Sequence, residues 1–438
     1  MFVLLTLILA QAPQQTPKDV EAHARAVVAM LVAGEFTKIE SQYDDQMARA
    51  LPAGALGASW ANSARQLGPF ESITSVQVDQ AGTNHVATVA CAFQNYTVTF
   101  RVVFNEAGQL AGLASVGLVP RVAWSPPDYA DATAFEERAI AVKTGRFELP
   151  GFVTIPKSAG RHPAIVLVHG SGPNDMDESG GPNKMFKDLA YGLASRGIAV
   201  LRYDKRTHKY GAQISDDPAQ MTVKDEEMDD ALSGVALVAS MPEIDPRRVF
   251  VAGHSEGAYL APRIAAGQPQ IAGIILLAGN ARPIEDLVVE QIRYEASTAG
   301  PMTPAIQRAI DSAEASARAI RDPDLKPGTI VRLLGSPLPA SYFLDLRTYH
   351  PTEVAASLTI PVLVLQGERD YQVTMTDFGL WQKALAGRAN ATLKSYSGLN
   401  HYFMMGTGPA SPAEYMRPGH VDKRVIDDVA AFCLARRS

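Results

Sequence analysis

From about residue 135 to the C-terminus, short runs of continuous apolar residues alternate with stretches that have helical spacing. Runs such as AIVLVHG, IAVLRYD, RVFVAGH, IAGIILLAG and IPVLVLQ show no polar alternation, so both faces of these strands are expected to be buried. Buried strands separated by helices pack as a mostly parallel sheet with helices on both faces. The sequence therefore predicts an α/β domain over residues 135–438, with a β-hairpin at its start, over residues 138–156.

One segment of this domain interrupts the alternation of strands and helices. Residues 282–350 are rich in Ala, Arg and Glu and contain no strong strand pattern, which predicts several helices inserted after the strand IAGIILLAG. An insertion at that point lies over the carboxyl ends of the strands, where ligands bind in open α/β sheets. We expect it to form a helical cap over a substrate site.

The chain before residue 121 follows a different pattern. Residues 18 to about 33 have helical spacing, and the β-rich runs SITSVQVDQ, HVATVACAF, YTVTFRVVF and LAGLASVGL follow. Helices followed by an antiparallel sheet predict a small α+β domain over residues 18–120. The segment 121–134 directly follows Pro120 and carries two further prolines, a composition typical of a linker. The small domain contains no acid–base constellation, so we expect it to serve as a spacer, a dimerisation surface or a substrate gate.

The first 17 residues resemble a leader. Phe2 to Ala10 is a short apolar run followed by a polar, proline-bearing stretch, which predicts a signal peptide and a secreted or periplasmic protein. This run is too short to span a bilayer, and no other stretch is apolar for long enough, so we expect no integral membrane span. The net charge of −6 comes with no long basic run, which excludes the positive surface that nucleic-acid binding needs. Two distant cysteines, Cys91 and Cys433, do not make a disulfide framework.

The strongest signal for chemistry is Gly253-His254-Ser255-Glu256-Gly257, a G-x-S-x-G pattern. It follows the strand RVFVA and precedes the helical run AYLAPRIAAG, and the glycines permit the tight turn that lifts a serine Oγ clear of the backbone. The helix that begins directly after the serine also favours developing negative charge. We therefore predict that Ser255 is a nucleophile; the alternative is a glycine-rich turn with an incidental serine.

A serine hydroxyl is a poor nucleophile until a base takes its proton. Of the nine histidines, His401 in GLNHYF has both the late position and the loop after the last strand that a base requires. Its imidazole needs an acid to fix its tautomer, and Asp370 ends a strand in the motif G-E-R-D. The separation, 401 − 370 = 31 residues, leaves room for one helix and one strand. Glu368 is the alternative acid, although a loop salt bridge or a solvated charge is its simpler role.

A tetrahedral intermediate needs hydrogen-bond donors for its oxyanion. One donor is expected from the backbone N–H of Glu256, directly after the nucleophile. The second is expected from the loop HGSGP after the strand AIVLV, with the N–H of Ser171 as first choice and that of Gly170 as second. Side chains and water complete this mechanism, so the sequence implies no cofactor.

A polar cluster follows the predicted oxyanion loop. The range 174–178 contains one amide and three acidic side chains, a composition that suits an amine or a cation. We expect instead that it pairs with Lys205 and Arg206. No metal site is predicted, because no His or Cys joins the cluster at ligand spacing.

These motifs, in this order, resemble the α/β-hydrolase superfamily over about residues 135–438. The runs HGSGPNDMDE and LRYDKR are similar to a bacterial branch of esterases, dienelactone-hydrolase-like proteins and serine aminopeptidases. Members of that branch often continue YDKRG-x-G-x-S, whereas here THKYG follows Arg206, so the substrate does not carry over by analogy. The element order of residues 18–120 resembles the cone-shaped domains of the nuclear-transport-factor-like superfamily. The resemblance implies an α/β-hydrolase fold with a helical cap, preceded by a small α+β domain.

Three functions follow from this interpretation. A serine hydrolase that cleaves a small-molecule carboxylic ester comes first, because ester cleavage needs only the triad and the oxyanion hole. An aminopeptidase-like enzyme on short peptides comes second and needs an anionic site for the substrate amine, which the range 174–178 or the cap acids would supply. A non-catalytic binding protein with the same fold comes third, and the intact triad positions argue against it. A dehalogenase is weaker still, since it would have an acid in place of Ser255.

Overall fold

The computed structural model describes residues 16–211, 213–298, 300–333 and 336–435. The predicted leader, residues 1–17, lies outside these ranges except for Thr16 and Pro17, which begin the first helix. The chain divides into two units, Met1–Ala123 and Trp124–Ser438, and the division falls inside the segment 121–134. In the described ranges, no helix combines the length and the apolar character that a membrane crossing requires.

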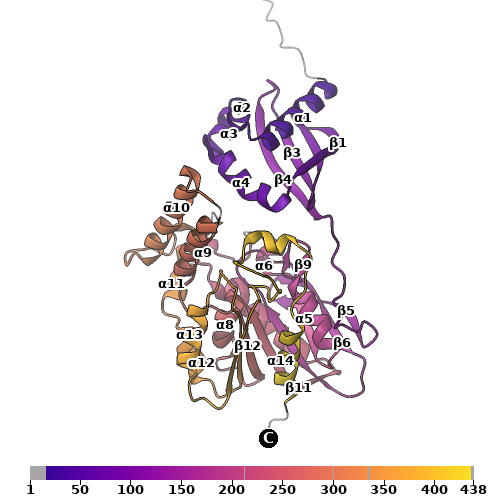
Figure 1. Cartoon of the computed structure of the whole chain (residues 1–438), viewed down its shortest axis with the longest axis vertical. Coiled ribbons are helices and arrows are strands. Elements are labelled where there is room, and N and C mark those ends of the chain that lie inside the picture. The colour runs from indigo at the N-terminus through magenta and orange to yellow at the C-terminus, as the bar shows by residue number, and fades with distance from the viewer. Residues whose placement is uncertain (1–15, 212, 299, 334–335, 436–438) are drawn as a thin grey trace, which may run out of the picture. The chain divides into compact units, whose positions relative to one another are not determined.

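Over its described residues, 16–123, the smaller unit has four helices followed by an antiparallel sheet in the order β1-β2-β3-β4 (Figure 1). A capping box starts the first helix: the Thr16 hydroxyl accepts from the Asp19 N–H, and the Asp19 carboxylate accepts from the Thr16 N–H. The predicted apolar side of this helix is buried at Val27, Val28 and Leu31. The elements are α1 (Pro17–Ala33), α2 (Phe36–Glu40), α3 (Asp45–Ala50), α4 (Ala55–Leu67), β1 (Phe70–Ala81), β2 (Asn84–Phe93), β3 (Tyr96–Phe104) and β4 (Leu110–Pro120).

The larger unit is built on an eight-stranded sheet in the order β16-β15-β12-β11-β7-β10-β6-β5. Neighbours from β16 to β10 pair in parallel, while β6 pairs antiparallel with β10 and with β5, so the predicted hairpin and the mostly parallel sheet are confirmed. The strands are β5 (Phe135–Thr144), β6 (Phe147–Pro156), β7 (His162–Val168), β10 (Ala199–Tyr203), β11 (Ile244–His254), β12 (Ile271–Leu277), β15 (Val362–Gly367) and β16 (Ala391–Tyr396).

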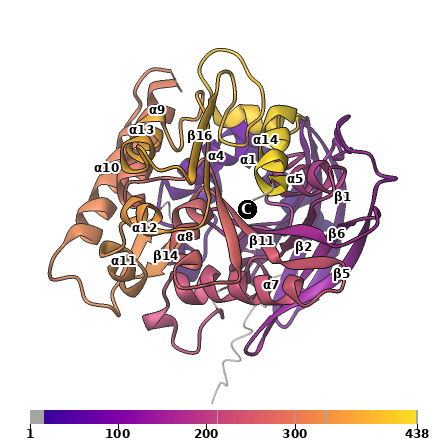
Figure 2. The ribbon, with the colours of Figure 1, turned by 90° about the horizontal axis from the view of Figure 1, so that it is seen from below.

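Helices cover both faces of this sheet, as the continuous apolar strands predicted. Successive residues of a strand point to opposite faces, so Ile165 packs in one core layer and Val166 in the other. One layer is closed by α5 (Met185–Ala194) and α14 (Lys423–Leu434), and the other by α7 (Asp229–Ala239), α8 (Glu256–Ala265), α12 (Pro351–Ser357) and α13 (Met375–Ala384). Figure 2 shows α5 and α14 on one side of the sheet and α7 and α8 on the other.

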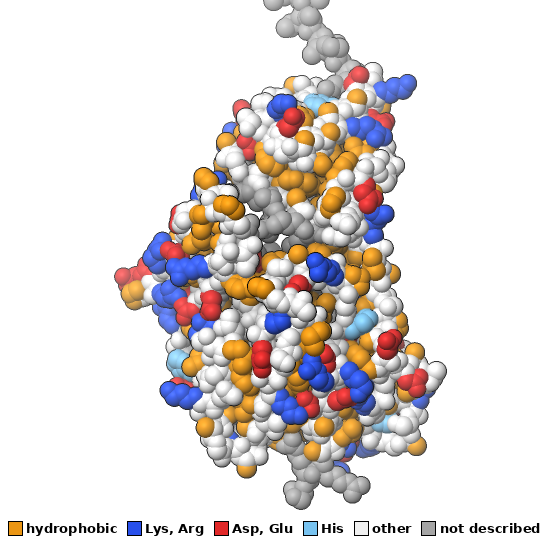
Figure 3. All heavy atoms as spheres, in the orientation of Figure 1, with side chains coloured by type: hydrophobic (Ala, Val, Ile, Leu, Met, Phe, Trp, Pro, Cys, Tyr) orange, Lys and Arg blue, Asp and Glu red, His pale blue; other side chains and the backbone are white. Residues whose placement is uncertain are grey.

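The described part of the segment predicted as a helical cap has three helices and also a strand pair that the sequence did not predict. It comprises α9 (Ile284–Thr298), α10 (Pro304–Arg321), β13 (Ile330–Leu333), β14 (Ser336–Pro339) and α11 (Ala340–Arg347). The sequence did not predict this strand pair because β13 has only four residues, of which alternate ones, Val331 and Leu333, are buried. Charged side chains gather over α9 and α10 (Figure 3), where they line a groove of about 630 Å³.

The cap lies at the carboxyl ends of the strands, as expected for an insertion after β12. The Tyr342 hydroxyl in α11 donates to Glu256, directly after β11, at 2.6 Å. The Tyr371 hydroxyl, in the loop after β15, donates to Glu295 in α9 at 3.2 Å. Both contacts join the cap to residues that follow strands at the same edge of the sheet.

Short elements connect the long ones. They are β8 (Ser179–Gly180), β9 (Asn183–Lys184), α6 (Arg206–Tyr210), the 3-10 turns Pro218–Gln220 and Pro412–Met416, and a π-helical turn at Lys224–Met228. Ahead of α7, the Thr222 N–H donates to the Asp225 carboxylate at 2.9 Å. The helix that follows nevertheless starts with the π-helical turn, which no propensity in the sequence indicated.

The contact between β6 and β10 requires a glycine at position 151. Gly151 is opposite Tyr203 in this pair, and a Cβ at Gly151 would collide with the carbonyl oxygen of Arg202 and lie 2.9 Å from the Cα of Tyr203. Since backbone cannot move as a side chain does, we expect Gly151→Ala to lower the free energy of unfolding by about 1–3 kcal/mol. Urea denaturation followed by circular dichroism measures this change.

Gly379→Ala is the matched control. Gly379 lies within α13, with no neighbouring atom within 4 Å of a Cβ placed there. Alanine is the better helix former, so this variant should gain roughly 0.5–1 kcal/mol. Equal urea midpoints for Gly151→Ala and the unmodified chain would contradict the steric argument.

Candidate active site

Ser255 occupies a strained turn between β11 and α8. Its φ of 53° and ψ of −116° lie where a residue with a Cβ is rarely found. A Cβ on Gly253 would collide with the carbonyl of Gly257, and one on Gly257 would lie 2.6 Å from the carbonyl oxygen of His169. The two glycines of the motif are therefore required by close backbone contacts, and the turn has the form that the motif predicted.

The structure brings His401 and Asp370 together. The Nδ1 atom of His401 lies 2.6 Å from the Asp370 carboxylate, and both side chains are buried. The other oxygen of this carboxylate accepts from the backbone N–H groups of Gln372 and Val373, at 2.8 and 3.0 Å. Gln366, near the end of β15, donates to Asp370 at 3.1 Å. These donors hold the carboxylate in one orientation toward the imidazole.

The alternative acid, Glu368, lies elsewhere. Its carboxylate accepts from the Ser395 hydroxyl at 2.8 Å on the surface, in agreement with the loop role considered from the sequence. The two loops that carry Asp370 and His401 meet at Gly367, because a Cβ there would lie 2.5 Å from the carbonyl oxygen of Leu399. The geometry therefore selects Asp370 as the partner of His401.

The predicted oxyanion loop lies beside Ser255. A Cβ on Gly170 would be 3.1 Å from the Cβ of Ser255. The Gly170 N–H donates to Glu178 at 2.9 Å, so this second-choice donor already has an acceptor. In the part of the chain that the structure describes, the backbone N–H groups of Ser171 and Glu256 donate to no protein group. Of the two candidate donors in this loop, the Gly170 N–H is therefore already bonded to a protein group, whereas the Ser171 N–H is not.

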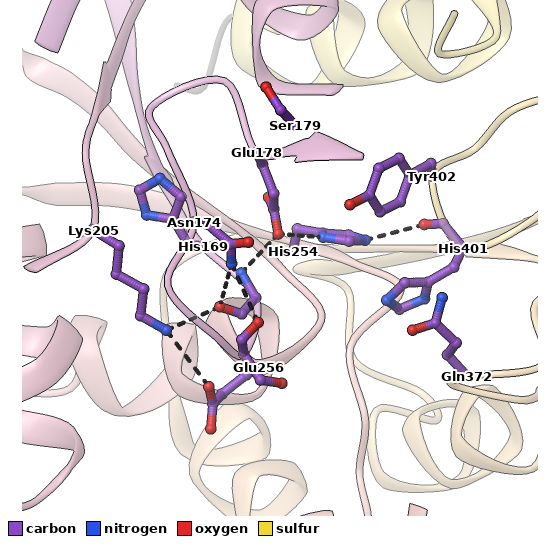
Figure 4. Close-up of polar contacts among 12 residues, drawn as sticks. His169, Asn174, Glu178, Ser179, Lys205, His254, Glu256, Gln372, His401 and Tyr402 are labelled. Atoms are coloured by element: carbon purple, nitrogen blue, oxygen red, sulfur yellow. Dashed lines mark hydrogen bonds and ion pairs between the residues drawn. The ribbon is translucent and has the colours of Figure 1, made fainter. Parts of the chain in front are cut away.

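Glu178 and His254 form a buried ion pair next to these residues (Figure 4). His254 Nδ1 donates to Glu178 at 2.9 Å and its Nε2 donates to the carbonyl oxygen of His401 at 3.0 Å. Two donating nitrogens mean a charged imidazolium. Burial alone would lower the pKa of His254, but the Glu178 carboxylate raises it above its ordinary value. The pair connects the oxyanion loop to the His401 loop.

A second buried cluster surrounds Lys205. Its ammonium donates to the carbonyl oxygen of Gly170 at 2.9 Å and lies 3.3 Å from Glu226, 3.3 Å from Glu227 and 3.7 Å from Glu256. Burial alone would lower the pKa of Lys205, but these carboxylates raise it, so the ammonium stays charged. For Glu256, burial raises the pKa to about 7, with Lys205 opposing and Glu226 adding to the shift.

We expected the acidic residues of the range 174–178 to pair with Lys205 and Arg206, and this prediction is wrong. Asp177 pairs with Arg202 and with Lys184, and Glu178 pairs with His254. Arg206 instead binds Asp230 through two hydrogen bonds. The described residues contain no group of three His, Cys, Asp or Glu side chains arranged to hold a metal ion.

Sequence reasoning did not predict the contacts that four residues make with the predicted site: Glu178, Lys205, His254 and Gln366. Lys205, His254 and Gln366 have a weak signal, since charged or polar residues directly follow or end continuous apolar strands in LRYDKR, VAGH and VLVLQ, whereas Glu178 follows no such strand. Such positions are buried at the sheet edge, where a polar side chain needs a partner. That signal marks a buried polar residue but does not name its partner.

Comparison with known proteins agrees with the fold. The family described as "Alpha/beta hydrolase family" matches residues 165–416. The family described as "Protein of unknown function (DUF3887)" matches residues 24–113, and it is a nuclear-transport-factor-like family, as the element order of the small unit suggested. The chain is also 38% identical over 405 residues to Esterase EstD of Thermotoga maritima, a match that covers 92% of this chain and 93% of that protein.

Solved structures are similar to the chain at low sequence identity. Est1E from Butyrivibrio proteoclasticus is 17% identical with a TM-score of 0.45, over 68% of this chain and 99% of that one. A puromycin-hydrolyzing peptidase of Mycobacterium tuberculosis is 16% identical with a TM-score of 0.43, over 83% of this chain and 47% of that one. From the family match over residues 165–416 and the relative that is 38% identical, the chain belongs to the α/β-hydrolase family.

Proposed function

We propose that this protein hydrolyses small-molecule carboxylic esters through an acyl-enzyme formed on Ser255. The observation that carries the proposal is the 2.6 Å contact of His401 with Asp370, on the loops next to the strained Ser255 turn. The name of the relative, Esterase EstD, supports the ester as the bond that is cleaved. Ser255, His401 and Asp370 are the proposed triad.

In the proposed mechanism, Asp370 accepts the Nδ1 proton of His401 and leaves its Nε2 free to act as a base. The Ser255 Oγ attacks the ester carbonyl carbon and its proton passes to Nε2. Collapse of the tetrahedral intermediate breaks the bond to the alkoxy oxygen, and the His401 proton leaves with the alcohol. Water then attacks the acyl-enzyme with His401 again as base, which releases the acid and restores Ser255.

The oxyanion formed in both steps needs donors whose hydrogen bonds are not already made. We assign the backbone N–H groups of Ser171 and Glu256 to this role. The Glu256 N–H is at the first residue of α8, so the helix dipole also favours the negative oxygen. The Gly170 N–H is less suited because it donates to Glu178.

Ester hydrolysis is favoured over aminopeptidase activity because the carboxylates in the range 174–178 already have partners. An aminopeptidase would need a free carboxylate for the substrate amine. Asp177 is paired with Arg202 and Lys184, Glu178 is paired with His254, and Asp175 accepts from the backbone and hydroxyl of Ser179. Of the three described carboxylates in the range 174–178, two are thus already paired with cations, and the oxygens of the third, Asp175, already accept from Ser179.

The nucleophile assignment predicts that Ser255→Ala abolishes ester hydrolysis. Alanine cannot form the acyl-enzyme, so kcat on p-nitrophenyl esters from C2 to C12 should fall by about 10⁵–10⁶-fold. The release of p-nitrophenol measures the rate. Ser395→Ala, which removes a surface hydroxyl bonded to Glu368, should keep the original rate. An unmodified enzyme that cleaves none of these esters would contradict the proposed substrate class, and residual activity of Ser255→Ala would contradict the nucleophile.

The acid assignment predicts different results for two neighbouring carboxylates. Asp370→Asn offers His401 an amide that favours the wrong tautomer, so kcat should fall by about 10⁴-fold. Glu368→Gln should stay within about twofold, because exposed surface contacts contribute little. Steady-state kinetics on a p-nitrophenyl ester compares the two variants. The reverse order of activities would exchange the roles of Asp370 and Glu368.

A further inference from the structure

The peptide between Gly170 and Ser171 is anchored through its carbonyl group. The Gly170 carbonyl oxygen accepts from Lys205 Nζ at 2.9 Å and from Asn174 Nδ2 at 2.9 Å. A trans peptide unit is planar, and its N–H points opposite to its C=O. Anchoring the Gly170 carbonyl therefore fixes the direction of the Ser171 N–H, which is the proposed oxyanion donor.

The preceding peptide is anchored as well. The Gly170 N–H donates to Glu178, whose carboxylate is in turn held by His254. Both peptide units that flank Gly170 are thus fixed, and a glycine whose two neighbouring peptides are fixed has lost its freedom to rotate. Figure 4 shows Lys205 and Glu178 reaching this loop from different segments of the chain.

Burying the Lys205 ammonium costs desolvation free energy, and its contact with the loop gives a reason for its position. Lys205 is 1% exposed, and a buried ion pair contributes little stability over an apolar side chain of the same volume. The π-helical turn at Lys224–Met228 places the consecutive residues Glu226 and Glu227 within 3.3 Å of its ammonium. Turns of this kind are frequent at functional sites.

Lys205 also contacts the residue that carries the other proposed donor. Its ammonium is 3.7 Å from the Glu256 carboxylate, and the backbone N–H of Glu256 is the second donor of the oxyanion hole. One buried cation therefore holds the carbonyl of the Ser171 peptide and pairs with Glu256. A cation on the carbonyl oxygen also polarises the amide, which strengthens its N–H as a donor.

We propose that Lys205 is a positioning residue of the oxyanion hole: it orients the Gly170–Ser171 peptide toward the oxyanion and connects it to the Glu256 segment. This inference rests on the proposed esterase function. Lys205 does not touch the substrate and acts through the backbone of the loop. Its effect is therefore specific to states in which the carbonyl oxygen is negatively charged.

The test compares Lys205→Met with Lys184→Met. Methionine matches the lysine side chain as far as Cε and removes the ammonium. Lys184 pairs with Asp177 at 2.6 Å, outside the Lys205 cluster, and serves as the control for loss of a lysine charge. Three quantities are measured: kcat and KM on p-nitrophenyl butyrate, the Ki of an alkyl trifluoromethyl ketone, and the Ki of the matched methyl ketone. The trifluoromethyl ketone adds to Ser255 and forms a tetrahedral oxyanion, whereas the methyl ketone binds as a planar carbonyl.

For Lys205→Met we expect kcat to fall about 30- to 100-fold with KM changed less than about threefold, since one oxyanion donor contributes about 10²–10³ in kcat. The Ki of the trifluoromethyl ketone should rise by a similar factor, while the Ki of the methyl ketone stays constant. Lys184→Met should change none of these by more than about twofold, as expected for a partly exposed ion pair.

The outcomes separate the two proposals. If Lys205→Met keeps the original kcat, or if both ketones weaken equally, the positioning role is overturned while the esterase function stands. If the unmodified enzyme cleaves no ester, or Ser255→Ala remains active, the proposed function fails and this inference fails with it. If Lys205→Met does not fold, Asn174→Ala decides: it removes the second hydrogen bond to Gly170, and an unchanged ratio of the two Ki values would overturn the proposal.

Discussion

The parallel pairing of β7, β11, β12 and β15 is the constraint on which the site depends. Parallel strands end on the same edge of a sheet, so the loops with Gly170, Ser255 and Asp370 leave the sheet at one edge, with β12 between the strands that lead to Ser255 and Asp370. Close backbone contacts then complete the arrangement, because Gly257 lies against the end of β7 and Gly367 against the loop before His401. The side chains proposed for catalysis are therefore positioned by backbone packing before any hydrogen bond between them is considered.

Much of this arrangement was predictable because it depends on local patterns. Continuous apolar runs predicted the buried strands, and the order of motifs at strand ends predicted that Ser255, Asp370 and His401 would lie near one edge. The predictions were correct where a feature depends on residues close together in the sequence, or on an apolar pattern that repeats with the period of a strand or helix. The strand pair in the cap has neither property, since only Val331 and Leu333 mark its first strand.

The ionic clusters were beyond sequence reasoning for a different reason. A buried charge must have a partner, but the sequence does not say which of many acids supplies it. Charge pairing of the 174–178 range with the next basic residues was a reasonable expectation, yet Lys205 pairs with Glu226, Glu227 and Glu256, and Asp177 pairs with Arg202. The deciding factor is the π-helical turn, which turns two consecutive acids toward one lysine. No local propensity specifies such a turn, and it is stable here because the charges it presents are compensated.

A chain of buried polar contacts connects the cap to the oxyanion loop. The Tyr342 hydroxyl of α11 donates to Glu256, the Glu256 carboxylate lies near the Lys205 ammonium, and Lys205 donates to Gly170. Removing any member leaves a buried polar group without its partner, which is more costly than the same loss at the surface. The cap and the oxyanion loop consequently share one set of buried charges. A substitution at Tyr342 thus alters the environment of Glu256, whose pKa burial already raises to about 7, and through it the residues that hold the proposed oxyanion donors.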